Sequence, residues 1–108
     1  MNARVLIQRA LVVSAAAAAL ATTGAANAQM ALAQSKNCTA CHAVDKKLIG
    51  PAFKDIAAKY KDADGAVAKL AGKVRAGGSG VWGQIPMPAN PQVSDAEAEQ
   101  LVKWVLSM

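Results

Sequence analysis

The chain has 108 residues, a formal net charge of +5 and only four aromatic residues: one Phe, one Tyr and two Trp. Its lysines are spread along the sequence rather than gathered in basic blocks with aromatic residues between them, which argues against a nucleic-acid-binding protein. It also has two cysteines and one histidine, too few soft ligands to fill a four-coordinate structural zinc site.

The N-terminal segment has the order of a secretory signal. A basic start is followed by an apolar run at about 10–21 and by an Ala-Asn-Ala end at 26–28. The apolar run is shorter than the about 20 residues that a membrane span needs, so cleavage after Ala28 is favoured over a retained anchor. We expect a cleaved signal at 1–28, export to the periplasm without stable membrane insertion, and a single mature domain at 29–108.

The mature domain is short of large apolar side chains. The signal holds two of the twelve basic residues and none of the seven acidic ones, so the mature net charge is only +3. A domain of this size is marginally stable unless something extra stabilises it. A disulfide between cysteines three positions apart closes too short a loop to contribute much, whereas a bound apolar prosthetic group would complete the core.

Helical periodicity predicts four helices, and no segment alternates as a strand does. The first helix runs from about Met30 into the region of Cys38. The second is expected to begin at Pro51, since proline suits the first helical position, and its apolar residues recur at helical spacing as far as Tyr60.

The third and fourth helices have clearer boundaries. Asp64 is a candidate N-cap for the third helix, which glycines at 77–80 end. Ser94 and Glu97 have the spacing of a capping box at the start of the fourth helix. Between these helices lies a long segment rich in Gly and Pro at 77–92, and a long ordered loop in a small domain is usually functional.

The sequence CTACH brings together Cys38, Cys41 and His42. A thioredoxin-like redox pair needs a βαβ context that is absent here, and a plain disulfide does not account for the histidine. Haem attachment accounts for all three residues. Cysteines at i and i+3 on a helical turn project in one direction, so each sulfur can form a thioether with one vinyl group, and the next residue can ligate the iron.

A second axial ligand has to come from a methionine of the mature chain. Met30 precedes the attachment motif and Met108 is the last residue, whereas Met87 lies between two prolines that restrict the loop. Ligation by His42 and Met87 leaves no open iron position and raises the reduction potential. This indicates a one-electron carrier rather than an enzyme; the alternative is a haem enzyme or a ligand-sensing haem protein in which the methionine is displaced.

Three segments carry a resemblance to a known family: CTACHAVDKKLIGPAFKDIAAKY, GVWGQIPMPAN and VSDAEAEQLVKWVLS. They resemble the short class I cytochromes c of bacteria, periplasmic monohaem carriers that pass electrons to nitrite reductase and to terminal oxidases. The resemblance covers essentially the whole mature chain. It implies a small all-α class I cytochrome c fold, with about four helices wrapped around one haem c that is covalently bound through Cys38 and Cys41.

The resemblance also implies roles for individual residues. His42 and Met87 correspond to the axial ligands, and Pro51 lies where a backbone carbonyl fixes the second nitrogen of the axial histidine. Trp82 corresponds to a tryptophan that donates its indole N–H towards a haem propionate. Asn90 is similar to the residue whose side-chain amide contacts the axial methionine sulfur.

Partners follow from the same resemblance. A cytochrome bc1-type donor and a nitrite reductase or terminal oxidase as acceptor are expected to dock transiently with a monomer. Relatives also place a basic side chain near a propionate, and here either Lys73 or Arg75 could serve.

Overall fold

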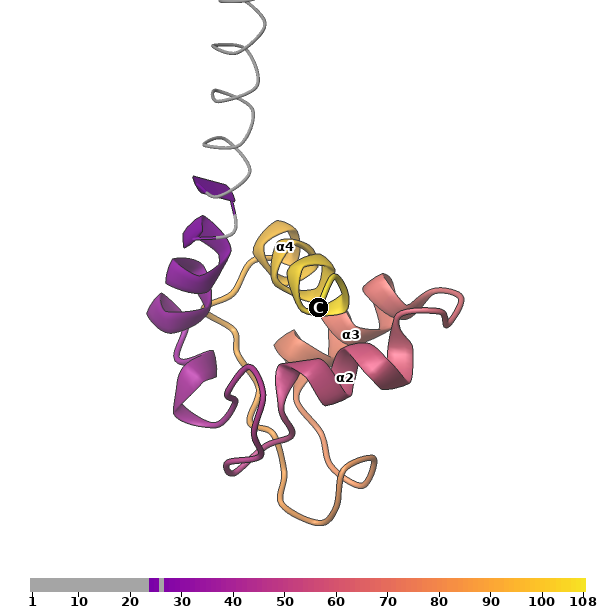
Figure 1. Ribbon diagram of the computed structural model, residues 1–108. Coiled ribbons are helices and arrows are strands. Elements are labelled where there is room, and N and C mark those ends of the chain that lie inside the picture. The colour runs from indigo at the N-terminus through magenta and orange to yellow at the C-terminus, as the bar shows by residue number, and fades with distance from the viewer. Residues whose placement is uncertain (1–23, 26) are drawn as a thin grey trace, which may run out of the picture.

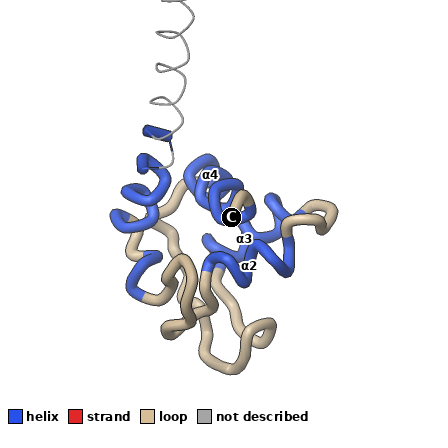
Figure 2. Tube along the Cα trace, in the orientation of Figure 1, coloured by secondary structure: helices blue, strands red, loops and turns tan. Residues whose placement is uncertain are grey.

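The computed structural model describes residues 24–25 and 27–108, so most of the signal predicted at 1–28 lies outside the described residues. A helical segment at 27–35 is followed by four further elements, namely the 3-10 helix η1 (Cys38–Ala40) and the α-helices α2 (Phe53–Tyr60), α3 (Ala66–Ala76) and α4 (Asp95–Leu106). Across this part of the chain, β-pairing is limited to two isolated bridges. The prediction of an all-α fold is therefore confirmed (Figure 2).

Helix α4 is the centre of the fold. It packs against both α2 and α3, and the segment at 27–35 lies on its other side (Figure 1). Their shared core is formed by Ala33, Ala71, Val93, Ala98, Leu101 and Val102. Six of the twelve buried apolar residues in the described chain are alanines, so the core that the helices share is small, as the composition predicts.

The start of α4 is held by local hydrogen bonds. The Ser94 hydroxyl accepts from the backbone N–H of Glu97 at 3.1 Å, and the Glu97 carboxylate accepts from the backbone N–H of Ser94 at 3.0 Å. This capping box is the one predicted. The hydrogen bond from Ser94 is the main reason why the pKa of Glu97 lies below its usual value. The apolar face that follows is buried as expected, at Ala98, Leu101, Val102 and Val105.

The predicted start of the second helix was wrong. Helix α2 begins at Phe53 with the extended residue Ala52 as its N-cap, so Pro51 precedes the helix instead of opening it. The backbone N–H of Phe53 donates to the carbonyl of Ala43 at 2.9 Å. In the same way, the N–H of the next residue donates to the carbonyl of Val44. These bonds satisfy first-turn donors that no helical carbonyl can reach, and they tie α2 to the segment that carries His42.

Two other boundaries also differ from the prediction. The N-cap of α3 is Gly65 in the left-handed conformation (φ 70°), and Asp64 makes no cap. The first helix ends at residue 35, because Asn37 adopts a left-handed φ of 66° before η1 begins. The attachment motif therefore begins on a separate short helix, with Cys41 as its C-cap and His42 just beyond it.

The long segment at 77–92 crosses the open side of the helices. Within this segment, the backbones of Gly78 and Met87 are joined by two hydrogen bonds, at 2.8 and 3.0 Å. The residues between them, 79–86, form an exposed lobe, which Figure 1 shows as the loop below α2 and α3. Among residues 24–25 and 27–108, we find no helical stretch with the length and hydropathy of a membrane span.

Candidate functional site

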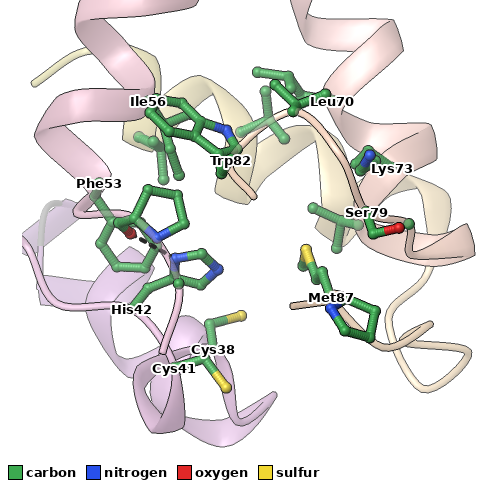
Figure 3. Close-up of a pocket in the computed structure, with 18 of the residues that line it drawn as sticks. Cys38, Cys41, His42, Phe53, Ile56, Leu70, Lys73, Ser79, Trp82 and Met87 are labelled. Carbon is green, nitrogen blue, oxygen red and sulfur yellow. Dashed lines mark hydrogen bonds between the residues drawn. The ribbon is translucent and has the colours of Figure 1, made fainter. Parts of the chain in front are cut away.

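A cavity of about 720 Å³ opens between the helices α2, α3 and α4, the segment at 38–51 and the long segment at 77–92. Such a volume lies within the range of about 300–1,000 Å³ that cofactor sites usually have. The walls are mainly apolar and include large side chains that the shared core lacks, namely Ile56, Leu70, Trp82 and Trp104. Both cysteines, the histidine and Met87 line the same space (Figure 3). The structure thus brings the predicted attachment motif and the predicted methionine together.

The two cysteines lie at one end of the cavity. Cys38 begins η1 and Cys41 is its C-cap, whose N–H donates to the Cys38 carbonyl. In a 3-10 helix the side chains at i and i+3 are eclipsed, so the two sulfurs are presented on the same side. Both thiols are free and half-buried, and burial raises the pKa of Cys38. This arrangement suits two parallel thioether bonds.

The imidazole of His42 has a defined tautomer. Its Nδ1 lies 2.7 Å from the carbonyl oxygen of Pro51. Because a carbonyl can only accept, Nδ1 carries a proton, which leaves Nε2 as the nitrogen available to a metal. The ring reaches into the cavity (Figure 3), so Nε2 is the nitrogen free to bind a metal.

Gly50 is a residue of the site that the sequence interpretation did not single out. A Cβ atom built there would lie 2.6 Å from Cε1 and 2.9 Å from Nδ1 of His42. The N–H of Gly50 also donates to the Cys41 carbonyl at 2.8 Å. The imidazole therefore occupies the space in which any other residue would place its side chain. The only signal in the sequence was a glycine directly before Pro51.

Replacing Gly50 by alanine is expected to displace the imidazole and to destabilise the folded protein by about 1–3 kcal/mol, the usual cost of overpacking. Denaturant unfolding of the haem-loaded protein measures this loss. Gly72→Ala is the comparison, because a Cβ at this position within α3, which borders the cavity, meets no protein atom within 4 Å. It should raise the stability by roughly 0.5–1 kcal/mol. Equal stability of the two variants would contradict the crowding at Gly50.

Met87 faces His42 from the opposite wall of the cavity, as Figure 3 shows. Its backbone is fixed on both sides by the hydrogen bonds to Gly78. The neighbouring Gly77 has a φ of 73°, and a Cβ there would lie 2.6 Å from the Met87 carbonyl oxygen. Close contact between two backbone segments, rather than side-chain packing, therefore positions the methionine.

Asn90 ties the end of the methionine loop to α3. Its Nδ2 donates to the carbonyls of Val74 at 3.0 Å and Pro88 at 3.1 Å, and its Oδ1 accepts from Gln92. Its backbone N–H donates to the carbonyl of Arg75. Asn90 thus holds both the loop and the helix, while a contact between its amide and the methionine sulfur remains a prediction.

The other end of the cavity is aromatic and basic. Trp82 is half exposed at the rim, with the ammonium of Lys59 5.2 Å from its ring centroid. Lys73 also lines the cavity, whereas Arg75 donates to the carbonyl of Val93 and to the carboxylate of Asp95. Of the two basic residues that the sequence left open, only Lys73 faces the cavity. Figure 3 shows Trp82 and Lys73 away from the cysteines.

These residues fit haem c. Two free thiols at one end suit the vinyl edge of the porphyrin, and apolar walls suit its faces. An imidazole and a thioether point in from opposite sides. Three or more His, Cys, Asp or Glu side chains grouped for a bare metal ion are not found in the residues that the structure covers. The donor set therefore favours a prosthetic group over a bare ion.

Comparisons with known proteins point to one family. The cytochrome c family model matches residues 24–108. Cytochrome c-552 of Nitrosomonas europaea is 57% identical over 93 residues, covering 86% of this chain and 90% of the relative. Cytochrome c-551 of Pseudomonas aeruginosa is 57% identical over 76 residues, covering 70% and 72%. A crystal structure of Nitrosomonas europaea cytochrome c552 matches with a TM-score of 0.70 at 59% identity, covering 72% of this chain and 96% of that one.

Proposed function

Because the chain belongs to the cytochrome c family of electron carriers and binds haem c covalently through Cys38 and Cys41, we propose that it is a periplasmic one-electron carrier with His42 and Met87 as axial ligands. The bound haem supplies one-electron exchange between ferric and ferrous iron. The observation that carries the proposal is the approach of an imidazole and a thioether from opposite walls of one apolar cavity. The signal-like order of residues 1–28 supports export.

The residues around the ligands have separate tasks in this proposal. The carbonyl of Pro51 keeps the proton of His42 on Nδ1 and makes Nε2 a better electron-pair donor to the iron. The Met87 thioether is a weak, neutral ligand that favours the ferrous state. The apolar walls exclude water, which disfavours the more highly charged ferric state and raises the reduction potential further.

Lys73 and Trp82 are proposed to contact the propionate groups of the haem. A haem carries its vinyl groups and its propionates on opposite edges, so thioethers at the cysteine end direct the propionates to the other end. The ammonium of Lys73 and the rim position of Trp82 support this assignment. A cation beside a carboxylate favours its charged form, and the indole N–H can donate to it.

An optical spectrum tests the ligation. The oxidised protein should show the weak methionine-to-ferric charge-transfer band at the red edge of the visible spectrum, and the reduced protein should not bind carbon monoxide readily. The alternative, a haem enzyme or ligand sensor with a displaceable methionine, predicts the reverse. Absence of the band together with ready carbon monoxide binding would exclude the carrier function.

Partner docking is proposed to occur at the mouth of the cavity. Large apolar side chains are exposed around it, namely Ile49, Val81, Trp82 and Ile85, with Leu48 beside Ile49. The exposed Lys46 and Lys47 add positive charge at this rim. An apolar ring with basic neighbours suits a redox protein with an acidic rim, and such contacts are small and transient. We propose that the protein works as a monomer that visits its donor and acceptor in turn.

Neutralising Lys46 and Lys47 together, with glutamine at both positions, is expected to slow electron transfer to an acidic redox partner about three- to tenfold at low salt, because these charges steer the encounter. Stopped-flow mixing with a purified nitrite reductase or terminal oxidase measures the rate. Lys61→Gln is the matched control, since Lys61 is exposed but does not line the main cavity. Equal slowing by the control would place the docking surface elsewhere.

A further inference from the structure

The imidazole of His42 has an aromatic neighbour in addition to its hydrogen bond. The ring of Phe53 lies stacked against it, with centroids 5.3 Å apart and an angle of 23° between the planes. Phe53 is the first residue of α2 and is buried. Figure 3 shows the two side chains together on one wall of the cavity. The periodicity of α2 explained Phe53 as a core residue, and the contact with His42 does not follow from that role.

The hydrogen bond to Pro51 does not by itself determine how the imidazole is turned. One hydrogen bond fixes the direction of the Nδ1–H group, and the ring can still tilt about that line. Gly50 limits the tilt at the ring edge, where the space is filled by Cε1 and Nδ1. Phe53 limits it at the ring face. The segment Gly-Pro-Ala-Phe at 50–53 thus restrains the imidazole in three ways. Gly50 lies at the ring edge, the Pro51 carbonyl accepts the hydrogen bond from Nδ1, and Phe53 covers one ring face.

Phe53 is itself held from behind. The ring of Trp104 on α4 makes an edge-to-face contact with it, with centroids 5.5 Å apart and planes at 65°. This is a favoured geometry for aromatic pairs. Because α4 is the centre of the fold, a shift of Phe53 away from His42 would require a shift of Trp104 as well. The rings of His42, Phe53 and Trp104 therefore form a continuous series of aromatic contacts from the cavity to the central helix.

We propose that Phe53 is a positioning residue that sets the plane of the His42 imidazole, and with it the electronic symmetry of the ferric site. The proposal rests on the axial role of His42 proposed above. Groups behind a metal ligand orient it and tune the metal, and the plane of an imidazole bound to the iron contributes, together with the other axial ligand, to how unpaired spin is distributed over the porphyrin. Phe53 is not placed to bind the iron. Its ring also lines the cavity, and the exchange of the His42 Nδ1 proton in the test below reports its contact with the ligand.

The test compares Phe53→Leu with Phe53→Tyr, which keeps the aromatic face. Two measurements on the haem-loaded protein are used: the spread of the four haem methyl resonances in the ferric NMR spectrum, and the hydrogen exchange of the His42 Nδ1 proton. In Phe53→Leu the methyl spread should change, and the exchange should become about three- to tenfold faster, as expected from the loss of one aromatic pair. Phe53→Tyr should retain both wild-type values.

Val93→Ala is the control for simple loss of core packing, because Val93 is buried but does not line the cavity. Its change in methyl spread should be several-fold smaller than that of Phe53→Leu. An unchanged spread in Phe53→Leu, or an equal change in Val93→Ala, would overturn the proposal. If Phe53→Leu fails to fold, Trp104→Leu replaces it. Because Trp104 lines the cavity as well, this variant is judged by the exchange of the His42 Nδ1 proton alone, which should become faster by a smaller factor; unchanged exchange would also overturn the proposal.

Failure of this proposal can be distinguished from failure of the proposed function. If His42 and Met87 are the ligands, the wild-type protein has the red-edge charge-transfer band whatever Phe53 does. A missing band in the wild-type protein refutes the ligation. A retained band in Phe53→Leu with an unchanged methyl spread refutes only the role of Phe53.

Discussion

Met87→Ala is expected to leave the haem attached to Cys38 and Cys41 but to lower the reduction potential by a few tenths of a volt, part of the about 0.8 V over which axial ligands act. The backbone of residue 87 is held by Gly78, so the loop can keep its place while the thioether is lost. The red-edge band should disappear, and the reduced protein should bind carbon monoxide. Potentiometry and optical spectra measure these changes.

Met108→Ala is the matched control for Met87→Ala. Met108 is the last residue and does not line the cavity, so its removal should leave both the potential and the spectrum unchanged. A wild-type potential in Met87→Ala, with no binding of carbon monoxide, would show that another group completes the coordination.

The double variant Cys38→Ala, Cys41→Ala is expected to lose covalent haem and to remain largely unfolded. Without its guest, the cavity of 720 Å³ leaves mainly apolar walls in contact with water, and burial of apolar surface is worth about 25 cal/mol per Å². A domain has a net stability of only about 5–15 kcal/mol to lose. The helices share only a small, alanine-rich core, so little remains to offset the cost. Far-UV circular dichroism of the purified chain measures the loss of helix.

Thr39→Ala provides the comparison for the cysteine variant. Thr39 lies between the two cysteines and does not line the cavity, so this protein should be red, should keep its haem in denaturant and should retain its helices. A double cysteine variant that folds normally without haem would contradict the argument that the cavity needs a guest.

The helices could be predicted because their signals are local. The capping box of Ser94 and Glu97 needs only four consecutive residues, and the buried face of α4 follows from spacing alone. The boundaries that were wrong depend on other parts of the chain or on the backbone conformation. Pro51 does not open α2, because the first-turn N–H groups of that helix find carbonyls at 43–44. The N-cap of α3 is Gly65 in a left-handed conformation. The sequence pattern had indicated Asp64 instead, because the backbone conformation of a glycine cannot be read from its neighbours.

The site residues likewise divide into those that the local sequence could predict and those that depend on distant segments. The attachment motif is contiguous, so the sequence could identify both cysteines and His42 as a haem-binding unit. The need for glycine at position 50 arises only when the imidazole folds back over it. The choice between Lys73 and Arg75 depends on where α4 begins, since Asp95 and the carbonyl of Val93 engage Arg75. Such contacts between distant segments have no signature in a single sequence.

The paired hydrogen bonds between Gly78 and Met87 fasten both ends of the lobe at 79–86 at one place. Substitutions on the outer surface of the lobe can therefore leave the backbone of the methionine unchanged, while Trp82 within the lobe keeps its place at the cavity rim. Val81 and Ile85, which line the cavity mouth, belong to this lobe. If partners dock at the cavity mouth as proposed, the outer residues of the lobe can change with the partner while the backbone of Met87 keeps its position.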